Sequence, residues 1–245
     1  MEFTFEQRLD DRVAEREFTL GEIPGILWTP GSTSASAPVP LILLGHPGGL
    51  PKMYPRLVAR ARHCAAEGFA AATIELFGSG DRPRSVAAEE ARADLHRALQ
   101  AGEPVDDEIV DRLVLPLVER AVPEWRTTLD ALLSLPEIGG PVGYAGGVIA
   151  IGIRLAVVEP RISAALLFAG SFVPRTLFEE ARQVTIPLQV LLQWDDEGND
   201  RQLALDLFDA FGSKEKTLHA NMGGHTGVPQ FEGDDGNRFF ARHLK

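Results

Sequence analysis

The feature that most constrains the fold of this chain is a regular alternation of short apolar runs and helical patterns from about residue 40 onward. Runs without polar alternation, such as Val39–Leu44, Phe69–Leu76 and Pro187–Trp194, indicate strands buried on both faces. Between them lie helical patterns such as Met53–Glu67, which is followed by Gly68 as a C-cap. This alternation predicts an α/β fold, with a mostly parallel central sheet and helices on both faces.

The remaining elements follow from the same patterns. Two antiparallel strands are expected near the N-terminus, and a helical insert without a strand interrupts the alternation at Ser85–Leu135. We interpret about residues 85–125 as a helical cap on a single domain, 1–245. The expected strands are Val13–Leu20, Ile23–Thr29, Pro141–Ala145, Ile162–Ala169 and Lys216–Asn221, and the expected helices are Val86–Ala101, Asp106–Ala121, Trp125–Leu135, Gly147–Val158, Leu177–Gln183, Asp200–Phe211 and Asn237–Leu244.

Composition narrows the function classes. The 245 residues carry 24 Lys and Arg against 35 Asp and Glu, a net charge of −11, which disfavours a nucleic acid partner. The single cysteine excludes a disulfide framework, and no apolar run is long enough to span a membrane. The N-terminus has no basic segment followed by an apolar stretch, so we expect no secretory signal and a cytoplasmic location. The composition neither predicts nor excludes a homodimer.

The segment with the clearest chemical signal is Gly143-Tyr144-Ala145-Gly146-Gly147. A predicted buried strand leads into small residues, and a helix follows, which is the context of a nucleophile elbow. We expect Ala145 at the position where the nucleophile of such an elbow stands. Alanine has no nucleophilic atom, and a glycine-rich turn is also explained by tight packing alone.

Three further loops follow predicted strands and support the elbow interpretation. Asp195 and Asp196 come after one strand, where the orienting acid of a catalytic triad lies. His225 stands in a glycine-rich loop after the last strand, as a general base would. The turn His46-Pro47-Gly48-Gly49 exposes backbone N–H groups suited to an oxyanion. Since the carboxyl ends of parallel strands share one edge of a sheet, these loops are expected to converge on one crevice.

In these motifs the chain resembles the α/β-hydrolases, most closely the dienelactone-hydrolase-like and small serine esterase branches, over roughly residues 20–245. The resemblance implies a serine–aspartate–histidine triad that works through an acyl-enzyme. It assigns Ala145 to the nucleophile position, Asp196 in preference to Asp195 to the acid, and His225 to the base. It also implies an oxyanion hole formed by the N–H of Gly146 together with that of Gly48 or Gly49.

Alanine at the nucleophile position has two explanations, a natural pseudo-enzyme or a serine hydrolase silenced by a Ser→Ala replacement. We favour the second, because the expected acid, base and glycine turns are all present. The predicted function is hydrolysis of a carboxylic ester or lactone. Alternatives are an amide or thioester hydrolase, an acyl transferase or cyclase with the same triad, and a ligand-binding protein without turnover.

Other residues receive more modest assignments. Tyr144, Phe77 and Trp194 are candidate substrate contacts, each equally consistent with core packing. Cys64 falls inside a predicted helix and is expected to be a buried packing thiol. His219 is a second candidate base, but its place inside a strand favours a structural role. No metal-binding spacing or nucleotide-binding motif is present, so we expect no metal and no cofactor.

Overall fold

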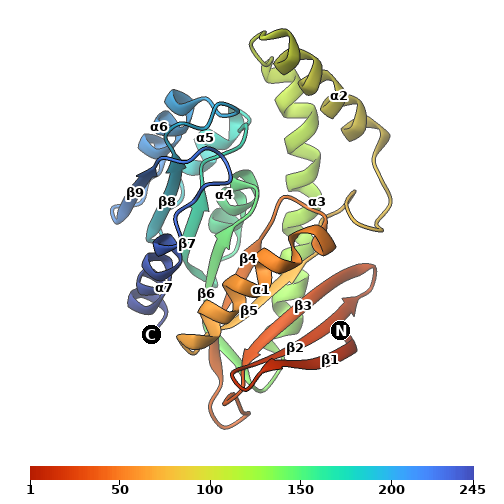
Figure 1. Ribbon diagram of the computed structural model, residues 1–245, viewed down its shortest axis with the longest axis vertical. Helices are drawn as coiled ribbons and strands as arrows, with labels where there is room; N and C mark the ends of the chain where they lie inside the picture. The colour runs from red at the N-terminus through yellow and green to blue at the C-terminus, as the bar shows by residue number, and fades with distance from the viewer.

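A nine-stranded sheet forms the centre of the molecule, and the computed structural model describes residues 1–245 (Figure 1). The strand order is β1-β2-β3-β5-β4-β6-β7-β8-β9. Strands β1, β2 and β3 pair antiparallel, and β3 pairs antiparallel with β5. The other neighbouring pairs are parallel, so six strands run in the same direction: β5, β4, β6, β7, β8 and β9. The strands are β1 Glu2–Asp10, β2 Val13–Leu20, β3 Ile23–Pro30, β4 Val39–Gly45, β5 Ala70–Ile74, β6 Ile138–Gly146, β7 Ile162–Phe168, β8 Leu188–Gln193 and β9 Lys216–Asn221.

Seven helices connect and cover these strands, which confirms the predicted mostly parallel sheet with helices on both faces. One apolar cluster packs α3, α4, α5 and α6 against the sheet, and a second packs α1 and α7 against the opposite face. The helices are α1 Leu50–Ala66, α2 Val86–Ala101, α3 Asp107–Leu133, α4 Ile149–Val158, α5 Thr176–Ala181, α6 Arg201–Ala210 and α7 Phe231–Leu244.

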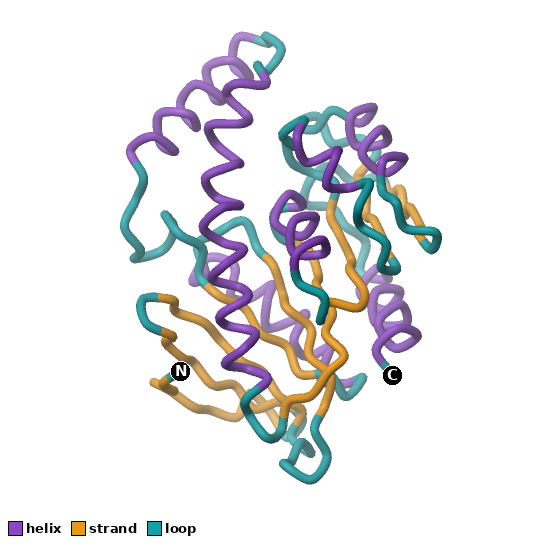
Figure 2. The backbone as a smooth tube through the Cα atoms, turned by 180° about the vertical axis from the view of Figure 1, so that it is seen from behind, coloured by secondary structure: helices purple, strands orange, loops and turns teal.

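The predicted helical insert is a two-helix hairpin. Figures 1 and 2 show α2 and the first half of α3 projecting beyond the sheet, while the second half of α3 lies along it. Two separate helices, Asp106–Ala121 and Trp125–Leu135, were expected on either side of Pro123, but α3 is continuous through both Pro116 and Pro123. Both prolines face solvent, so their rings do not disturb the buried face of the helix. None of the helices is long and apolar enough to cross a membrane.

The N-terminal strand β1 was not anticipated. Its residues are mostly exposed, with the sequence Glu-Phe-Thr-Phe-Glu-Gln-Arg-Leu-Asp, and it forms the edge of the sheet beside β2. An exposed edge strand buries little apolar surface and therefore leaves a weak pattern in the sequence. This edge lies at the opposite end of the strand order from β8 and β9, whose following loops carry the candidate acid and base.

Candidate active site

The structure brings Asp196 and His225 together at the carboxyl end of the sheet. Asp196 follows β8, and His225 lies in the loop between β9 and α7. His225 Nδ1 is 2.7 Å from Asp196 Oδ2, and the carboxylate side chain is buried while the imidazole is half-exposed. The N–H of Gly198 donates to the other carboxylate oxygen, and the ring of Phe168 packs edge-on against the imidazole. This arrangement fixes the imidazole and leaves its Nε2 edge for a reacting group.

Asp195 has a different position from its neighbour. Its Oδ1 accepts hydrogen bonds from the N–H groups of Gly223 and Gly224, at 2.8 and 2.9 Å. These hydrogen bonds lower the pKa of the Asp195 carboxyl, and the bond from Gly224 has the largest effect. Asp195 therefore holds the loop that carries His225, while the geometry favours Asp196 as the partner of the imidazole.

The strand-to-helix turn lies slightly later in the chain than the sequence suggested. Ala145 is inside β6, paired with β4 and β7, and only 4% exposed. The residues with positive φ are Gly146 and Gly147, at 75° and 73°, and α4 begins after Val148 as its N-cap. A Cβ atom on Gly147 would lie 2.8 Å from the Cα of Gly45, so this close approach requires glycine. The turn is thus formed by residues 146–148, and none of the residues 145–149 carries a hydroxyl, thiol or carboxylate.

A guanidinium stabilises the two strand ends beneath this turn. Arg60 of α1 donates to the carbonyl oxygen of Gly45 at 3.1 Å and to that of Ala145 at 2.7 Å. Burial lowers the pKa of Arg60, which has no carboxylate partner. A Cβ atom on Gly146 would also lie close to the Nη atoms of Arg60. Arg60 therefore links the carboxyl ends of β4 and β6 to α1.

The glycine turn after β4 uses its N–H groups internally. His46 donates from Nε2 to the carbonyl oxygen of Ile74 at 2.8 Å, and its Nδ1 accepts from the N–H of Gly48 at 3.0 Å. Desolvation lowers the pKa of His46. The N–H of Gly49 donates to Glu75 Oε1 at 3.0 Å. Both donors expected to form half of an oxyanion hole are therefore occupied by side chains of the protein.

The three candidate substrate contacts have different environments. Tyr144 points into the core, is 1% exposed and packs edge-on against Trp125, and its burial raises the pKa of the phenol. Phe77 is partly exposed beneath the guanidinium of Arg120. Trp194 is 40% exposed and is covered by the guanidinium of Arg201. Tyr144 thus has the packing role, and Phe77 and Trp194 reach the surface.

Three further residues with a thiol or hydroxyl group, Cys64, Ser79 and Ser171, form no hydrogen bond with His225. Cys64 is buried in α1, and burial raises the pKa of its thiol to about 12. Ser79 donates to the Glu75 carboxylate and to the carbonyl oxygen of Leu76, as a turn residue. Ser171 has a buried Oγ without a hydrogen-bond partner and lines a cavity of about 10 Å³. Such a volume holds about one water molecule and no ester.

Sequence reasoning missed the structural roles of Glu75 and Arg60. Glu75 is 3% exposed and accepts from the N–H groups of Gly49, Leu50 and Leu76. A single charged residue at the end of an apolar run, as in Phe69–Leu76, is the signal that could have identified it, because a buried carboxylate needs donors. Arg60 has no comparable signal, since α1 contains several other arginines.

Comparisons with known proteins place this geometry in a wider group. No protein-family model matches the chain, and no curated protein sequence matches it. A cold-adapted esterase from an Arctic intertidal metagenomic library is 28% identical, covers 100% of both chains and has a TM-score of 0.78. Acetyl xylan esterase 1 from Thermoanaerobacterium sp. JW/SL YS485 is 15% identical over 98% of this chain and 86% of the other, with a TM-score of 0.66.

A third solved structure extends the likeness in fold. The esterase Pf2001 from Pyrococcus furiosus is 10% identical over 94% of this chain and 91% of its own, with a TM-score of 0.62. At this identity the likeness concerns the fold alone, as it does for the acetyl xylan esterase. The order of the strands, the positions of the helices and the three structures agree: this chain has the α/β-hydrolase fold.

Proposed function

We propose that this protein has a hydrolase-type site for carboxylic esters or lactones at the carboxyl end of its sheet, and that this site lacks the nucleophile needed for an acyl-enzyme. The hydrogen bond between Asp196 and His225 is the observation that carries the proposal. The cold-adapted esterase, similar over the whole of both chains, supports a carboxylic ester hydrolase function. A small-molecule ester or lactone is therefore the proposed ligand.

The Asp196–His225 pair has the chemistry of a general base. Asp196 accepts the Nδ1 proton, which fixes the tautomer and leaves the lone pair of Nε2 free to take a proton from an attacking hydroxyl. The carboxylate then stabilises the imidazolium, and the imidazolium returns the proton to the leaving alcohol. In a complete triad a serine hydroxyl in the strand-to-helix turn is the attacking group.

We assign the nucleophile position of this turn to Val148 and not to Ala145. Val148 directly precedes the first residue of α4, and the small residues Gly146 and Ala150 flank it at the elbow spacing. The next N–H is that of Ile149, one of the first helix N–H groups, which have no intrahelical partner. Ile149 thereby replaces Gly146 as the proposed oxyanion donor. Ala145 is paired on both sides within the sheet and is only 4% exposed, which disfavours this role.

This assignment changes the explanation of the missing nucleophile. Valine is not the minimal replacement of a serine, so the assignment gives no support to a Ser→Ala variant at position 145. Hydrolysis of an amide or thioester, and acyl transfer or cyclisation by the same triad, need the same missing nucleophile as ester hydrolysis, so its absence does not discriminate among these reactions. The second candidate function is ester binding without turnover, which the absence of any nucleophilic atom over residues 145–149 favours.

The test compares two serine substitutions three residues apart. Val148→Ser is expected to raise hydrolysis of p-nitrophenyl acetate about 100-fold or more over the unmodified protein, because it supplies a hydroxyl at the proposed nucleophile position. Ala145→Ser is the matched control, since it adds the same group inside β6 and is expected to change the rate less than twofold. The gain from Val148→Ser should disappear when His225→Ala is added. A gain with Ala145→Ser alone would refute the assignment to Val148.

A binding measurement separates the two candidate functions. The unmodified protein is titrated with a short-chain ester by calorimetry while product is followed by chromatography. Saturable binding without product, together with an inactive Val148→Ser protein of unchanged fold, would replace the hydrolase interpretation by the binding one. Ester turnover by the Val148→Ser protein supports the hydrolase interpretation.

A further inference from the structure

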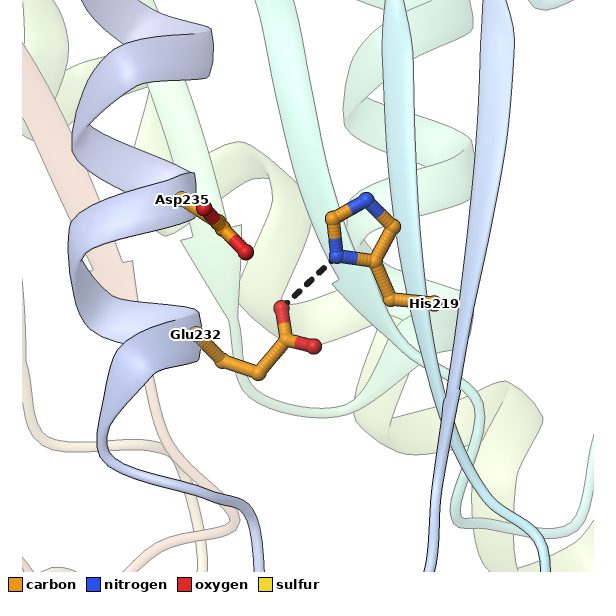
Figure 3. A group of neighbouring side chains, drawn as sticks. All are labelled: His219, Glu232 and Asp235. Carbon is orange, nitrogen blue, oxygen red and sulfur yellow. Dashed lines mark hydrogen bonds and ion pairs between the residues drawn. The ribbon is translucent and has the colours of Figure 1, made fainter.

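His219, Glu232 and Asp235 form a cluster of metal-ligating side chains that shares no residue with the Asp196–His225 pair (Figure 3). His219 lies on β9, and the two acidic residues lie in the first turns of α7. One ligand atom from each side chain lies within 4.8 Å of the other two. In Figure 3 all three side chains point into the space between the strand and the helix.

The cluster is built around a buried carboxylate. Glu232 is 4% exposed, and its Oε2 lies 2.8 Å from His219 Nδ1. Its Oε1 accepts from Asn221 Nδ2 at 2.8 Å. No lysine or arginine pairs with Glu232, and the one arginine bonded to the cluster, Arg238, contacts Asp235. The three side chains therefore carry net negative charge whether the imidazole is neutral or protonated, which favours a bound cation.

We propose that His219, Glu232 and Asp235 bind a divalent transition metal ion of the Zn²⁺ type. One imidazole nitrogen and two carboxylate oxygens are a donor set that Zn²⁺, Co²⁺ and Mn²⁺ accept. Zinc–ligand bonds of about 2.0–2.2 Å in a tetrahedral site separate the ligand atoms by about 3.4 Å. The separations in the cluster, from 2.8 Å up to 4.8 Å, bracket this value, so small side-chain movements complete the site.

The surroundings supply the supporting contacts that such a site needs. Asn221 holds the second oxygen of Glu232 and so orients the carboxylate toward His219. The three ligands leave a fourth tetrahedral position for water. No sequence motif indicates this site, because the histidine precedes the first carboxylate by 13 residues and lies on a different element.

The site joins both ends of the loop that carries His225. Strand β9 ends at Asn221 and helix α7 begins at Phe231, so residues 222–230 form the connection. A metal ion held by His219 and by Glu232 would bridge the strand before this loop and the helix after it. Metal binding is therefore expected to restrict the motion of the loop, without a contact to His225 itself.

Calorimetric titration with Zn²⁺ tests the site after treatment of the full chain with a chelator. One equivalent is expected to bind, and Asp235→Asn is expected to raise the dissociation constant at least tenfold. Asp234→Asn is the matched control, because it removes the same charge from the neighbouring residue, whose carboxylate lies 3.7 Å from His63. The control is expected to change the constant less than twofold. Absence of saturable binding, or a larger effect of Asp234→Asn, would overturn the proposal.

Two spectroscopic readouts complete the test. Co²⁺ bound in place of Zn²⁺ is expected to give visible absorption bands that Asp235→Asn removes and Asp234→Asn retains. Hydrogen–deuterium exchange of residues 222–230 is expected to slow at least threefold when Zn²⁺ is added to the unmodified chain. Unchanged exchange with Zn²⁺ bound would overturn the bridging role. Circular dichroism of both variants checks that each is folded, so that a loss of binding is not a loss of structure.

Discussion

Replacing Glu159 by glutamine removes one negative charge from the end of α4, the helix that follows the turn at residues 146–148. Glu159 is the C-cap of α4, and its side chain is 2% exposed. Arg161 donates to it from Nε at 2.7 Å and from Nη2 at 2.6 Å, and Arg126 of α3 donates at 3.3 Å. The carboxylate therefore ties α4 to α3 and to the start of β7.

These donors stabilise the charged carboxylate and set the expected magnitude. The hydrogen bonds from Arg161 are the largest cause that lowers the pKa of Glu159 from 4.5 to about 2. A carboxyl whose pKa falls that far on folding contributes about 3 kcal/mol to the free energy of unfolding at pH 7. Because the folded-state pKa is the lower one, this contribution is present above pH 4.5 and is lost as the pH falls toward 2. At pH 3 about 1.4 kcal/mol remains.

Urea unfolding followed by circular dichroism measures the effect. Glu159→Gln is expected to lower the free energy of unfolding by about 3 kcal/mol at pH 7 and by roughly half of that at pH 3. Asp130→Asn is the control, because Asp130 is the exposed partner of Arg161 and is expected to cost less than about 1 kcal/mol. A loss from Glu159→Gln that is the same at both pH values, or below about 1 kcal/mol at pH 7, would refute the electrostatic reasoning.

Three further changes probe the turn, the thiol and the acid. Gly147→Ala is expected to lower the free energy of unfolding by about 2–4 kcal/mol in urea, from strain at φ 73° and contact with the Gly45 backbone. Gly68→Ala, with φ 75° and open space around it, isolates the strain and should cost about 1–2 kcal/mol; equal losses would argue against the close contact. The thiol of Cys64 should react with a disulfide reagent only on unfolding, so rapid reaction in the folded protein would contradict its burial. In the Val148→Ser background, Asp196→Asn is expected to remove most of the gain in kcat for p-nitrophenyl acetate, about 100-fold, and an unchanged kcat would remove Asp196 from the proposed triad.

The sequence was sufficient where one pattern had one explanation. Uninterrupted apolar runs predicted the buried parallel strands, and β9 was predicted at its observed bounds, Lys216–Asn221. Two residues that follow separate strands, Asp196 and His225, were expected at one edge of the sheet and lie 2.7 Å apart. Parallel strands impose this outcome, because their carboxyl ends share an edge.

The sequence was insufficient where overlapping patterns or distant partners decide the result. Gly143, Gly146 and Gly147 allow more than one position for the turn, and the paired register of β6 decides that Ala145 stays in the strand. The sequence pattern predicted a free N–H group at Gly49, but this group donates to Glu75, 26 residues away. The orientation of Tyr144 follows from strand alternation, which turns it toward Trp125.

Labelling with a fluorophosphonate probe, read by intact-mass spectrometry, tests the central proposal most directly. The probe phosphonylates an activated serine with release of fluoride, so it reports the nucleophile without a choice of substrate. The unmodified chain and the Ala145→Ser protein are predicted to stay at their own masses, while the Val148→Ser protein gains one adduct at the substituted residue. An adduct on the unmodified chain, or on the Ala145→Ser protein but not on the Val148→Ser protein, would contradict the proposal.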